Sequence, residues 1–310
     1  MTDTLIDTST IDRDYGVPAH QEHRLTLPDG RTLAVAEWGD PDGKPVITFH
    51  GTPGSRIGYW TNEPEIWKRF GLRKFSFDRP GYGDSTRLPG RSVADVVPDV
   101  VAIAEAFGLR RFAISGGSGG GPHVLACAAL IPERVMRCLA SVSVAPFHAD
   151  GVDFLAGMNE GNVREFGAAV EGEAALRAVI EPTRLEMIEA LTAGRSDFLG
   201  EGYDMPEADQ IEMRKHQKAA AAHLLTAIAQ GVDGWVDDDI AFTTPWGFDV
   251  ASCRVPVVLA YGRQDQLVPA AHGDWLAERV PGATVWVDDD TGHMGSDAQV
   301  ERDLAWLRDG

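Results

Sequence analysis

The first third of the chain alternates short apolar runs with polar turns. Residues 23–27 and 32–38 have the pattern of two strands on either side of a Pro-Asp-Gly turn, which predicts an antiparallel hairpin. Residues 45–49 and 73–77 are short apolar runs typical of buried strands, and the segment between them has apolar residues at helical spacing. Strand and helix therefore begin to alternate here.

The pattern continues with a capped helix and two further strands. Ser92 is followed three positions later by an acidic residue, which predicts a capping box and a helix that ends at Gly108. A strand at residues 112–115 leads into a glycine-rich turn, after which residues 124–130 are compatible with a helix. Another apolar strand is predicted at residues 135–144.

Strand signals almost disappear between residues 146 and 250, where helical segments include the alanine-rich run at residues 218–228. The alternation then resumes as strand, helix, strand and closing helix, at residues 255–261, 271–280, 284–287 and up to 308. The stretch from 146 to 250 therefore reads as a helical insertion into an alternating fold.

Strands that alternate with helices indicate an α/β fold, a mostly parallel sheet flanked by helices with ligand sites at the carboxyl ends of its strands. We predict a core domain from residues 21–145 and 251–310, with residues 146–250 as a helical cap (lid) packed over the sheet edge. Residues 1–20 form an N-terminal tail that is expected to be mobile or weakly docked. The alternative that this tail is an arm that reaches the second subunit of a homodimer stays open.

The charge balance argues against several partners. Lys and Arg total 28 against 47 Asp and Glu, a formal charge of −19 that repels nucleic acid and anionic membrane surfaces. The N-terminus lacks the features of a signal peptide, and no segment has the length and apolarity of a bilayer span. Because the N-terminus resembles no signal peptide and no span is found, a cytoplasmic location is expected by default. The three cysteines show no paired or zinc-binding spacing, so we expect neither disulfides nor a metal. The expected partner is a small-molecule substrate.

A Gly-x-Ser-x-Gly pattern lies where a predicted strand meets a predicted helix, with Ser118 at its centre. A serine in so tight a turn adopts a strained backbone, and its neighbours Gly116 and Gly120 leave room for chain and substrate. A phosphate-binding loop would need a lysine here, and Pro122 stands where a dinucleotide fingerprint has its third glycine. We therefore predict that Ser118 is a nucleophile.

Partners of the right kind follow in the right order. Asp265 comes after the predicted strand at residues 255–261, and His293 comes after the strand at residues 284–287. Because the carboxyl ends of parallel strands share one rim of a sheet, Ser118, Asp265 and His293 are expected to converge as a catalytic triad. Four residues stay open as alternatives, two for the acid and two for the base: Asp150 and Asp249, His123 and His272.

The loop at residues 50–54, His-Gly-Thr-Pro-Gly, follows an earlier predicted strand. We predict that the backbone amides of Thr52 and Gly119 form an oxyanion hole, in which each donor is worth on the order of 3 kcal/mol. The Gly119 amide lies at a helix N-terminus, where unpaired N–H groups favour negative charge. His50 is interpreted first as a structural residue of this loop, and residues 78–85 as a tight loop that shapes the rim.

Together these motifs resemble the capped serine hydrolases of the α/β-hydrolase fold, and the resemblance covers most of residues 22–308. It implies an eight-stranded sheet with a helical lid and an acyl-enzyme mechanism that needs no cofactor. The chain is also similar to proline iminopeptidases, but those usually have a second glycine in place of Thr52 and a tryptophan in place of Gly119. A serine nucleophile also differs from the carboxylate of epoxide hydrolases and haloalkane dehalogenases.

We therefore expect hydrolysis of carboxylic esters of small or medium-sized molecules. An aminopeptidase or amidase of the proline iminopeptidase type, a carbon–carbon bond hydrolase acting on a diketone, and a non-catalytic receptor stay open as alternatives. Candidate pocket residues are mostly aromatic: His50, Phe147, Phe154, Met158, Phe166, Trp235, Phe242, Trp246 and Met294. The acidic residues Glu160 and 237–239 suit either an amine-binding site or a solvated helix face.

Overall fold

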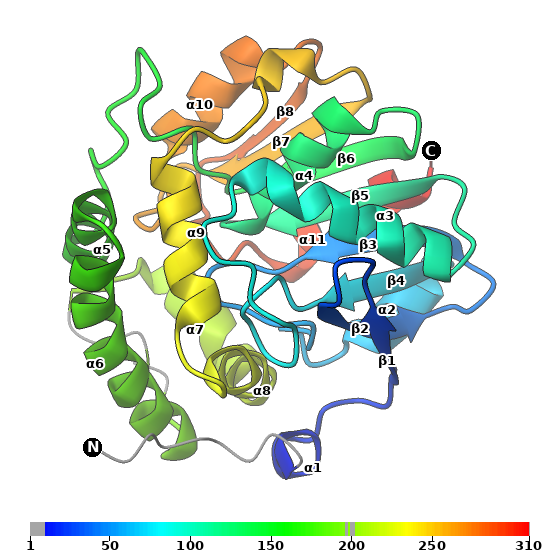
Figure 1. Ribbon diagram of the computed structural model, residues 1–310, viewed down its shortest axis with the longest axis horizontal. Helices are drawn as coiled ribbons and strands as arrows, with labels where there is room; N and C mark the ends of the chain where they lie inside the picture. Colours follow the sequence, from blue (N-terminus) through cyan, green and yellow to red (C-terminus); the bar gives the residue numbers. More distant parts are fainter. Residues whose placement is uncertain (1–9, 196–197, 199–201, 310) are drawn as a thin grey trace.

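The computed structural model describes residues 10–195, 198 and 202–309. One eight-stranded sheet has the order β1-β2-β4-β3-β5-β6-β7-β8 (Figure 1). Its strands are β1 (Gln21–Thr26), β2 (Thr32–Gly39), β3 (Lys44–Phe49), β4 (Leu72–Phe77), β5 (Phe112–Gly117), β6 (Val135–Ser141), β7 (Val257–Gly262) and β8 (Thr284–Asp288). Strand β2 is antiparallel to β1 and β4, and the pairs from β4 to β8 are parallel. The predicted mostly parallel eight-stranded sheet is confirmed.

Helices cover both faces of the sheet, because its strands are apolar on both sides. Apolar residues of α2 (Glu63–Arg69) and α11 (Asp297–Arg308) pack on one face of the sheet. Apolar residues of α3 (Val97–Ala106), α4 (Gly120–Leu130) and α10 (Ala270–Arg279) pack on the other face. Successive residues of β3 point into different apolar clusters, Val46 into the first and Ile47 into the second, as the two-residue period of a strand dictates.

Most predicted elements are found within a few residues of their expected bounds. The capping box at Ser92 is present, although the helix starts with a 3₁₀ turn, η2 (Val93–Val96), before α3. The strand predicted to run to residue 144 ends at Ser141, because Val142 takes a positive φ of 44° that breaks the extended backbone.

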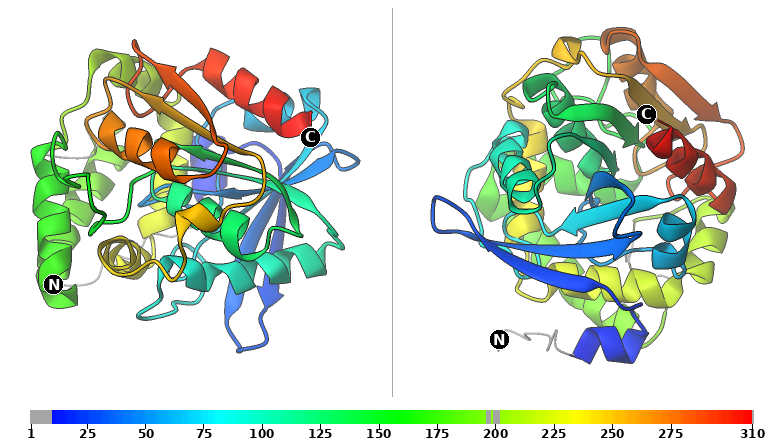
Figure 2. Two further views of the ribbon diagram at one scale, coloured as in Figure 1. Left: turned by 90° about the horizontal axis from the view of Figure 1, so that it is seen from above. Right: turned by 90° about the vertical axis from the view of Figure 1, so that its right-hand side faces the viewer.

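In the described residues between β6 and β7, the region predicted as a helical insertion, the structure has five helices, which we call the cap. They are α5 (Glu160–Glu171), α6 (Glu173–Thr192), α7 (Glu207–Lys215), α8 (Gln217–Ile228) and α9 (Asp233–Thr243), and a short 3₁₀ turn, η3 (Val250–Ser252), leads back to the sheet. Figures 1 and 2 show α5 and α6 on the side farthest from the C-terminus, with α9 between them and the sheet.

The described part of the N-terminal tail is docked on the cap. Helix α1 (Ile11–Tyr15) lies beside α8 in both figures, and Ile11 is only 3% exposed within the apolar cluster of the cap. Residues 1–9 lie outside the described part of the chain. The tail is therefore in contact with the cap from Ile11 onward, through a buried isoleucine, and the strength of that docking stays a prediction. Among the described helices, none combines the length and apolarity needed to cross a bilayer.

Candidate active site

Ser118 occupies the turn between β5 and α4, and its φ of 53° is positive, which is uncommon for a residue with a side chain. Its amide donates to the Ser141 carbonyl at 2.9 Å, and its own carbonyl accepts from the Gly121 amide at 2.8 Å. A Cβ atom at Gly116 would lie 2.7 Å from the Gly120 carbonyl oxygen. The turn is therefore held by hydrogen bonds in a strained shape that glycine neighbours alone permit.

Asp265 and His293 meet at the carboxyl ends of β7 and β8. His293 Nδ1 donates to Asp265 Oδ2 at 2.7 Å, and Asp265 Oδ1 accepts from the amides of Leu267 and Val268, both at 2.8 Å. Both oxygens of this buried carboxylate are thus engaged. With its proton on Nδ1, the imidazole keeps a lone pair on Nε2 for accepting a proton.

The environment of His293 favours its charged form. Burial lowers the pKa of the ring, but the charge of Asp265, the hydrogen bond that the ring donates to Asp265 and the charge of Asp209 together outweigh burial, so the pKa is raised above 6.5. A base tuned in this way holds a proton more strongly than free histidine does.

Ser118 and His293 line the same cavity, which has a volume of about 470 Å³ and also contacts Thr52 and Gly119. In the described part of the chain, the Ser118 hydroxyl has no hydrogen-bond partner, so it is available to a molecule that enters the cavity. The structure thus brings the three predicted catalytic residues to one edge of the sheet, with Asp265 behind His293.

The two predicted oxyanion-hole residues are direct neighbours. A Cβ atom at Gly119 would lie 2.1 Å from Thr52 Oγ1, and one at Gly51 would lie 3.5 Å from Ser118 Cβ. Within the described residues, neither the Thr52 amide nor the Gly119 amide donates to a protein acceptor. Two unpaired N–H groups therefore stand beside the serine, as an oxyanion hole requires.

Asp238 of α9 holds the Thr52 loop from the cap side. This fully buried carboxylate accepts from Thr52 Oγ1 at 2.7 Å, Arg79 Nη2 at 2.5 Å, Arg91 Nη2 at 2.6 Å and the Tyr82 hydroxyl at 2.8 Å. Burial raises the pKa of Asp238, but the two arginines outweigh it and hold that pKa well below 3.8. The cap is thus fixed to the core through a buried ionic cluster.

Of the two alternatives left open for these acidic residues, a solvated helix face is wrong for residues 237–239 and agrees with the exposure of Glu160. Asp237, Asp238 and Asp239 are at most 4% exposed, whereas Glu160 is exposed. Residues 237–239 are buried because α9 lies between the sheet and the outer cap helices (Figure 1). Two core arginines pair with its acidic side chains, Arg87 with Asp237 and Arg91 with Asp238.

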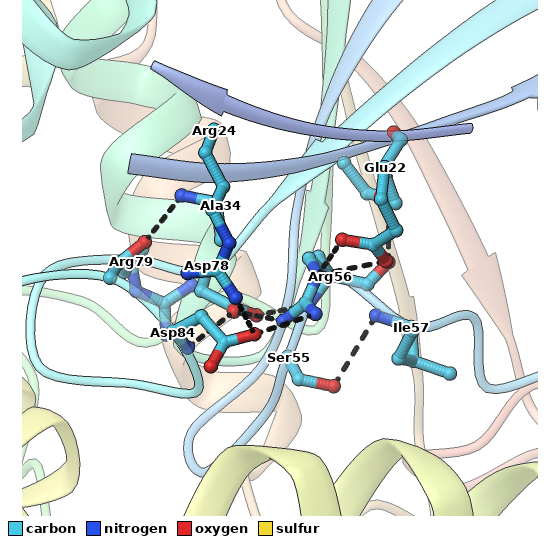
Figure 3. Close-up of polar contacts among 12 residues, drawn as sticks. Glu22, Arg24, Ala34, Ser55, Arg56, Ile57, Asp78, Arg79 and Asp84 are labelled. Carbon is cyan, nitrogen blue, oxygen red and sulfur yellow. Dashed lines mark hydrogen bonds and ion pairs between the residues drawn. The ribbon is translucent and has the colours of Figure 1, made fainter. Parts of the chain in front are cut away.

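The loop at residues 78–85 is tied to its neighbours through Arg56, as Figure 3 shows. The Arg56 guanidinium donates to Asp78 Oδ2 at 2.5 Å, to Asp84 Oδ2 at 2.9 Å and to Glu22 Oε2 at 2.8 Å. The Arg56 amide also donates to Asp78 Oδ1 at 2.6 Å. This loop is therefore a rigid part of the rim, in agreement with the interpretation from its sequence.

His50 is a structural residue that also borders the cavity. Its Nδ1 donates to the Gly51 carbonyl at 2.7 Å, and its Nε2 accepts from the Arg79 amide at 3.0 Å. Burial, followed by the nearby Arg79 charge, lowers the pKa of His50 well below 6.5, so the ring is neutral.

The alternative acids and bases have other partners. His272 Nδ1 accepts from the Ala145 amide at 3.0 Å, and burial lowers the pKa of this ring to about 4. His123 contacts the Gly119 carbonyl at 2.8 Å through Nδ1, and burial lowers its pKa to about 3. Asp249 caps η3, and Asp150 is exposed. None of them pairs with Ser118.

The predicted pocket residues divide into two groups. His50, Phe166, Trp235, Phe242 and Met294 line the cavity. Phe147, Phe154, Met158 and Trp246 do not line it, so their prediction as pocket residues is wrong. They pack instead in the apolar core, where Phe154 meets the Phe166 and His272 rings and Trp246 stacks on Phe248.

Two neighbouring acidic side chains border the cavity: Asp239 of α9, one of the acidic residues that suit an amine-binding site, and Glu165 of α5, which no sequence pattern singled out. Glu165 accepts from Trp235 Nε1 at 2.7 Å and from the Tyr203 hydroxyl at 2.5 Å. Asp239 is 1% exposed, and in the described part of the chain no group other than the adjacent Glu165 carboxyl is a partner for its oxygens. Burial, then the charge of the neighbouring Glu165 and a hydrogen bond with it, raise the pKa of Asp239 well above 3.8, so the pair of carboxyl groups favours holding a proton.

One group in the described residues has ligand atoms close enough to hold a metal ion: Glu212, His216 and Asp297, within 4.8 Å of one another. Its charges are already compensated. The Lys215 ammonium donates to Glu212 at 2.6 Å, and His216 Nδ1 accepts from the Thr61 amide at 3.3 Å, which leaves the proton on Nε2 facing Asp297. The donor set therefore does not favour a metal.

Comparison with known proteins agrees with this architecture. A family model described as the alpha/beta hydrolase fold matches residues 44–169. A non-heme chloroperoxidase of Streptomyces lividans is 27% identical over 252 residues, which cover 80% of this chain and 83% of the relative. A proline iminopeptidase of Xylella fastidiosa is 33% identical over 117 residues, 36% of each protein. The chain thus has the α/β-hydrolase fold and is distantly similar in sequence to these enzymes.

Solved structures share the fold at low sequence identity. A hydrolase from Pseudomonas aeruginosa PA01 superposes with a TM-score of 0.66 at 20% identity, covering 94% of this chain and 97% of its own. A thermophilic esterase from Thermogutta terrifontis gives a TM-score of 0.65 at 20% identity, covering 93% and 97%. At this identity the likeness shows the fold alone and does not identify the reaction.

Proposed function

We propose that this protein is a serine hydrolase that cleaves carboxylic esters of small or medium-sized molecules through an acyl-enzyme. The observation that carries the proposal is the His293–Asp265 hydrogen bond of 2.7 Å at the cavity that the strained Ser118 also borders. A turn of this kind, a histidine with its Nδ1 proton fixed by a buried carboxylate and two free amides beside the serine together suit acyl transfer.

In the proposed reaction, His293 Nε2 takes the Ser118 proton while the serine oxygen attacks the ester carbonyl. The Thr52 and Gly119 amides donate to the oxyanion of the tetrahedral intermediate, and Asp265 stabilises the imidazolium. The imidazolium then gives its proton to the leaving alcohol. Water attacks the acyl-enzyme by the same route, with His293 again as base, and the acid product is released.

Covalent labelling tests the nucleophile. A fluorophosphonate probe should label the wild-type protein at Ser118, and Ser118→Ala should neither label nor hydrolyse p-nitrophenyl esters. Ser115→Ala is the matched control, because Ser115 also lines the cavity but lies within β5. Equal labelling of wild type and Ser118→Ala, or loss of labelling in Ser115→Ala alone, would contradict the proposed role of Ser118.

A second candidate, hydrolysis of an amine-bearing substrate as in an aminopeptidase or amidase, is favoured by the carboxyl pair in the cavity. Asp239 is buried beside the Glu165 carboxyl, and among the described residues no cationic or amide group bonds to its oxygens. Two buried carboxyl groups side by side cannot both ionise cheaply, and a cationic amine would supply the opposite charge that they lack. Entry of that amine would favour ionised Asp239 and release its proton.

Matched substrates separate the two candidates. We would compare an amino acid ester and its arylamide with an ester in which a methyl group replaces the amine. If the amine is recognised, Glu165→Gln and Asp239→Asn should raise KM at least ~10-fold for the amine-bearing substrates only. Glu160→Gln, an exposed acid on the same helix as Glu165, is the control. Equal KM values with and without the amine would leave the neutral ester as the substrate class.

A further inference from the structure

One cap residue reaches the backbone of the predicted catalytic histidine. Asp209 lies in α7 and is 1% exposed. Its Oδ2 accepts from the His293 amide at 2.8 Å, and its Oδ1 accepts from the Met294 amide at 2.9 Å. A Cβ atom at Gly292 would lie 2.3 Å from Asp209 Oδ2, so the approach also depends on glycine at that position. One carboxylate therefore binds two successive amides of this loop.

The loop has two separate supports. On its β8 side the core holds Thr291, whose carbonyl accepts from the Gln264 amide at 3.0 Å and whose Oγ1 accepts from Gln299 Nε2 at 3.2 Å. The next support, at His293 and Met294, comes from the cap through Asp209. In the described part of the chain these two amides have no other acceptor. The core thus fixes the start of the loop, and the cap fixes the histidine itself.

This geometry is unlike that of an ordinary helix cap. Asp209 lies in the first turn of α7, yet its oxygens bind a loop of the core rather than the amides of its own helix. The Asp265 carboxylate fixes the ring of His293, and the Asp209 carboxylate fixes the backbone from which that ring projects. Position and orientation of one side chain are therefore set by two acids from two parts of the fold.

We propose that Asp209 is a positioning residue for the reaction: it holds the backbone of His293 so that the base is aligned with Ser118 only while α7 of the cap is seated on the core. This inference rests on the proposed serine hydrolase function. It assigns to the cap a part in the chemistry, in addition to covering the cavity. Displacement of α7 would release the His293 loop, so that cap movement and catalytic competence are coupled.

Several titratable groups face this site, and they define what a pH profile reports. Asp209 is faced by His293 and Asp265 from the loops after β8 and β7, and by Tyr59 from the loop after β3. Burial raises the pKa of Asp209, and the two amides oppose that rise. The negative charge of Asp209 also helps to raise the pKa of His293.

The test uses Asp209→Ala and Asp209→Asn, with Glu207→Gln as the control, because Glu207 is exposed on the same helix. Asp209→Ala should lower kcat for a p-nitrophenyl ester, and the rate of fluorophosphonate labelling, on the order of 10²-fold, the loss expected from a shift of about 1 Å. KM should change less than ~3-fold. Asp209→Asn keeps one acceptor oxygen and should lose less.

Two further readouts separate positioning from general loosening of the cap. The acid limb of the kcat/KM profile should move to lower pH in both Asp209 variants, because a charge that raises the pKa of His293 is removed. The His293 and Met294 amides should exchange hydrogen slowly in wild type and rapidly in Asp209→Ala. Wild-type kcat in both Asp209 variants, or a loss confined to KM, would overturn the inference while leaving the proposed function intact. A wild type that neither labels nor hydrolyses esters would instead overturn the proposed function, and the inference with it.

Discussion

Replacing Gly119 by alanine tests whether the Thr52 and Gly119 amides act together on the oxyanion. The added Cβ atom would lie 2.1 Å from Thr52 Oγ1, 2.8 Å from Thr52 Cβ and 3.1 Å from Phe242 Cζ. Thr52 cannot rotate away at low cost, because its hydroxyl donates to Asp238 at 2.7 Å and accepts from Arg79 at 3.1 Å. The two residues must therefore separate by about 1 Å, which misplaces one amide donor.

The size of the effect follows from the role of that donor. Loss of one oxyanion-hole donor costs roughly 10²–10³ in kcat, or about 3–4 kcal/mol of barrier. We expect Gly119→Ala to lower kcat roughly 10²-fold for p-nitrophenyl esters, with KM little changed. Thr52→Gly keeps the backbone amide but loses the hydroxyl contacts, so a loss of about tenfold is expected, near 1.4 kcal/mol.

The double variant tests whether the contact between positions 52 and 119 causes the loss of activity in Gly119→Ala. Thr52→Gly removes the two atoms that the new methyl group would approach most closely and leaves only the 3.1 Å contact with Phe242 Cζ, which a small shift of the ring relieves. Gly119→Ala/Thr52→Gly should therefore stay within ~3-fold of Thr52→Gly alone. That result corresponds to a coupling energy of about 2 kcal/mol between the two positions. Circular dichroism and melting temperature serve as controls for folding. If the kcat losses of the two single variants multiply in the double variant, or if Gly119→Ala keeps wild-type kcat, the two amides do not act together on the oxyanion.

Three further substitutions test the site and its supports. Asp265→Asn should lower kcat on the order of 10⁴-fold and move the acid limb of the ester pH profile to lower pH, since the main group that raises the pKa of His293 is removed. Asp238→Ala leaves two buried arginines without their partner and should cost about 3–5 kcal/mol in urea unfolding, whereas Asp233→Ala, at a half-exposed site, should cost less than about 1 kcal/mol. Asp239 has a raised pKa in the folded state, so stability should fall as pH rises above about 4. Asp239→Asn should flatten that decline, and an unchanged pH dependence of unfolding would contradict the assignment.

The sheet and the order of its elements follow from local patterns. Apolar runs such as residues 45–49 and 73–77 become β3 and β4 because a strand buried on both faces needs continuous apolar residues. The elbow is also local, since Ser118 and the glycines around it dictate one turn. Chain order then places Asp265 and His293 at neighbouring strand ends, because parallel strands carry their carboxyl ends to one rim.

Local sequence patterns do not predict how the cap packs on the sheet. Its helices are recognisable from the sequence, but an acidic stretch such as residues 237–239 has the same composition whether it faces water or buried arginines. The side of α9 that meets Arg79 depends on how the cap packs, and helical periodicity does not encode that choice. For the same reason Trp235 and Trp246 are indistinguishable in sequence, although Trp235 lines the cavity and Trp246 packs in the core.

The sequence by itself therefore determined the α/β architecture, the strained serine and the candidate partners at 265 and 293, because each depends on local backbone preferences and on strand order. Tertiary structure alone decided which cap residues border the cavity, and it brought Asp209 and Asp238 onto the His293 and Thr52 loops. Those contacts join segments far apart in the chain. They depend on the packing of the cap against the sheet, which a single sequence does not specify.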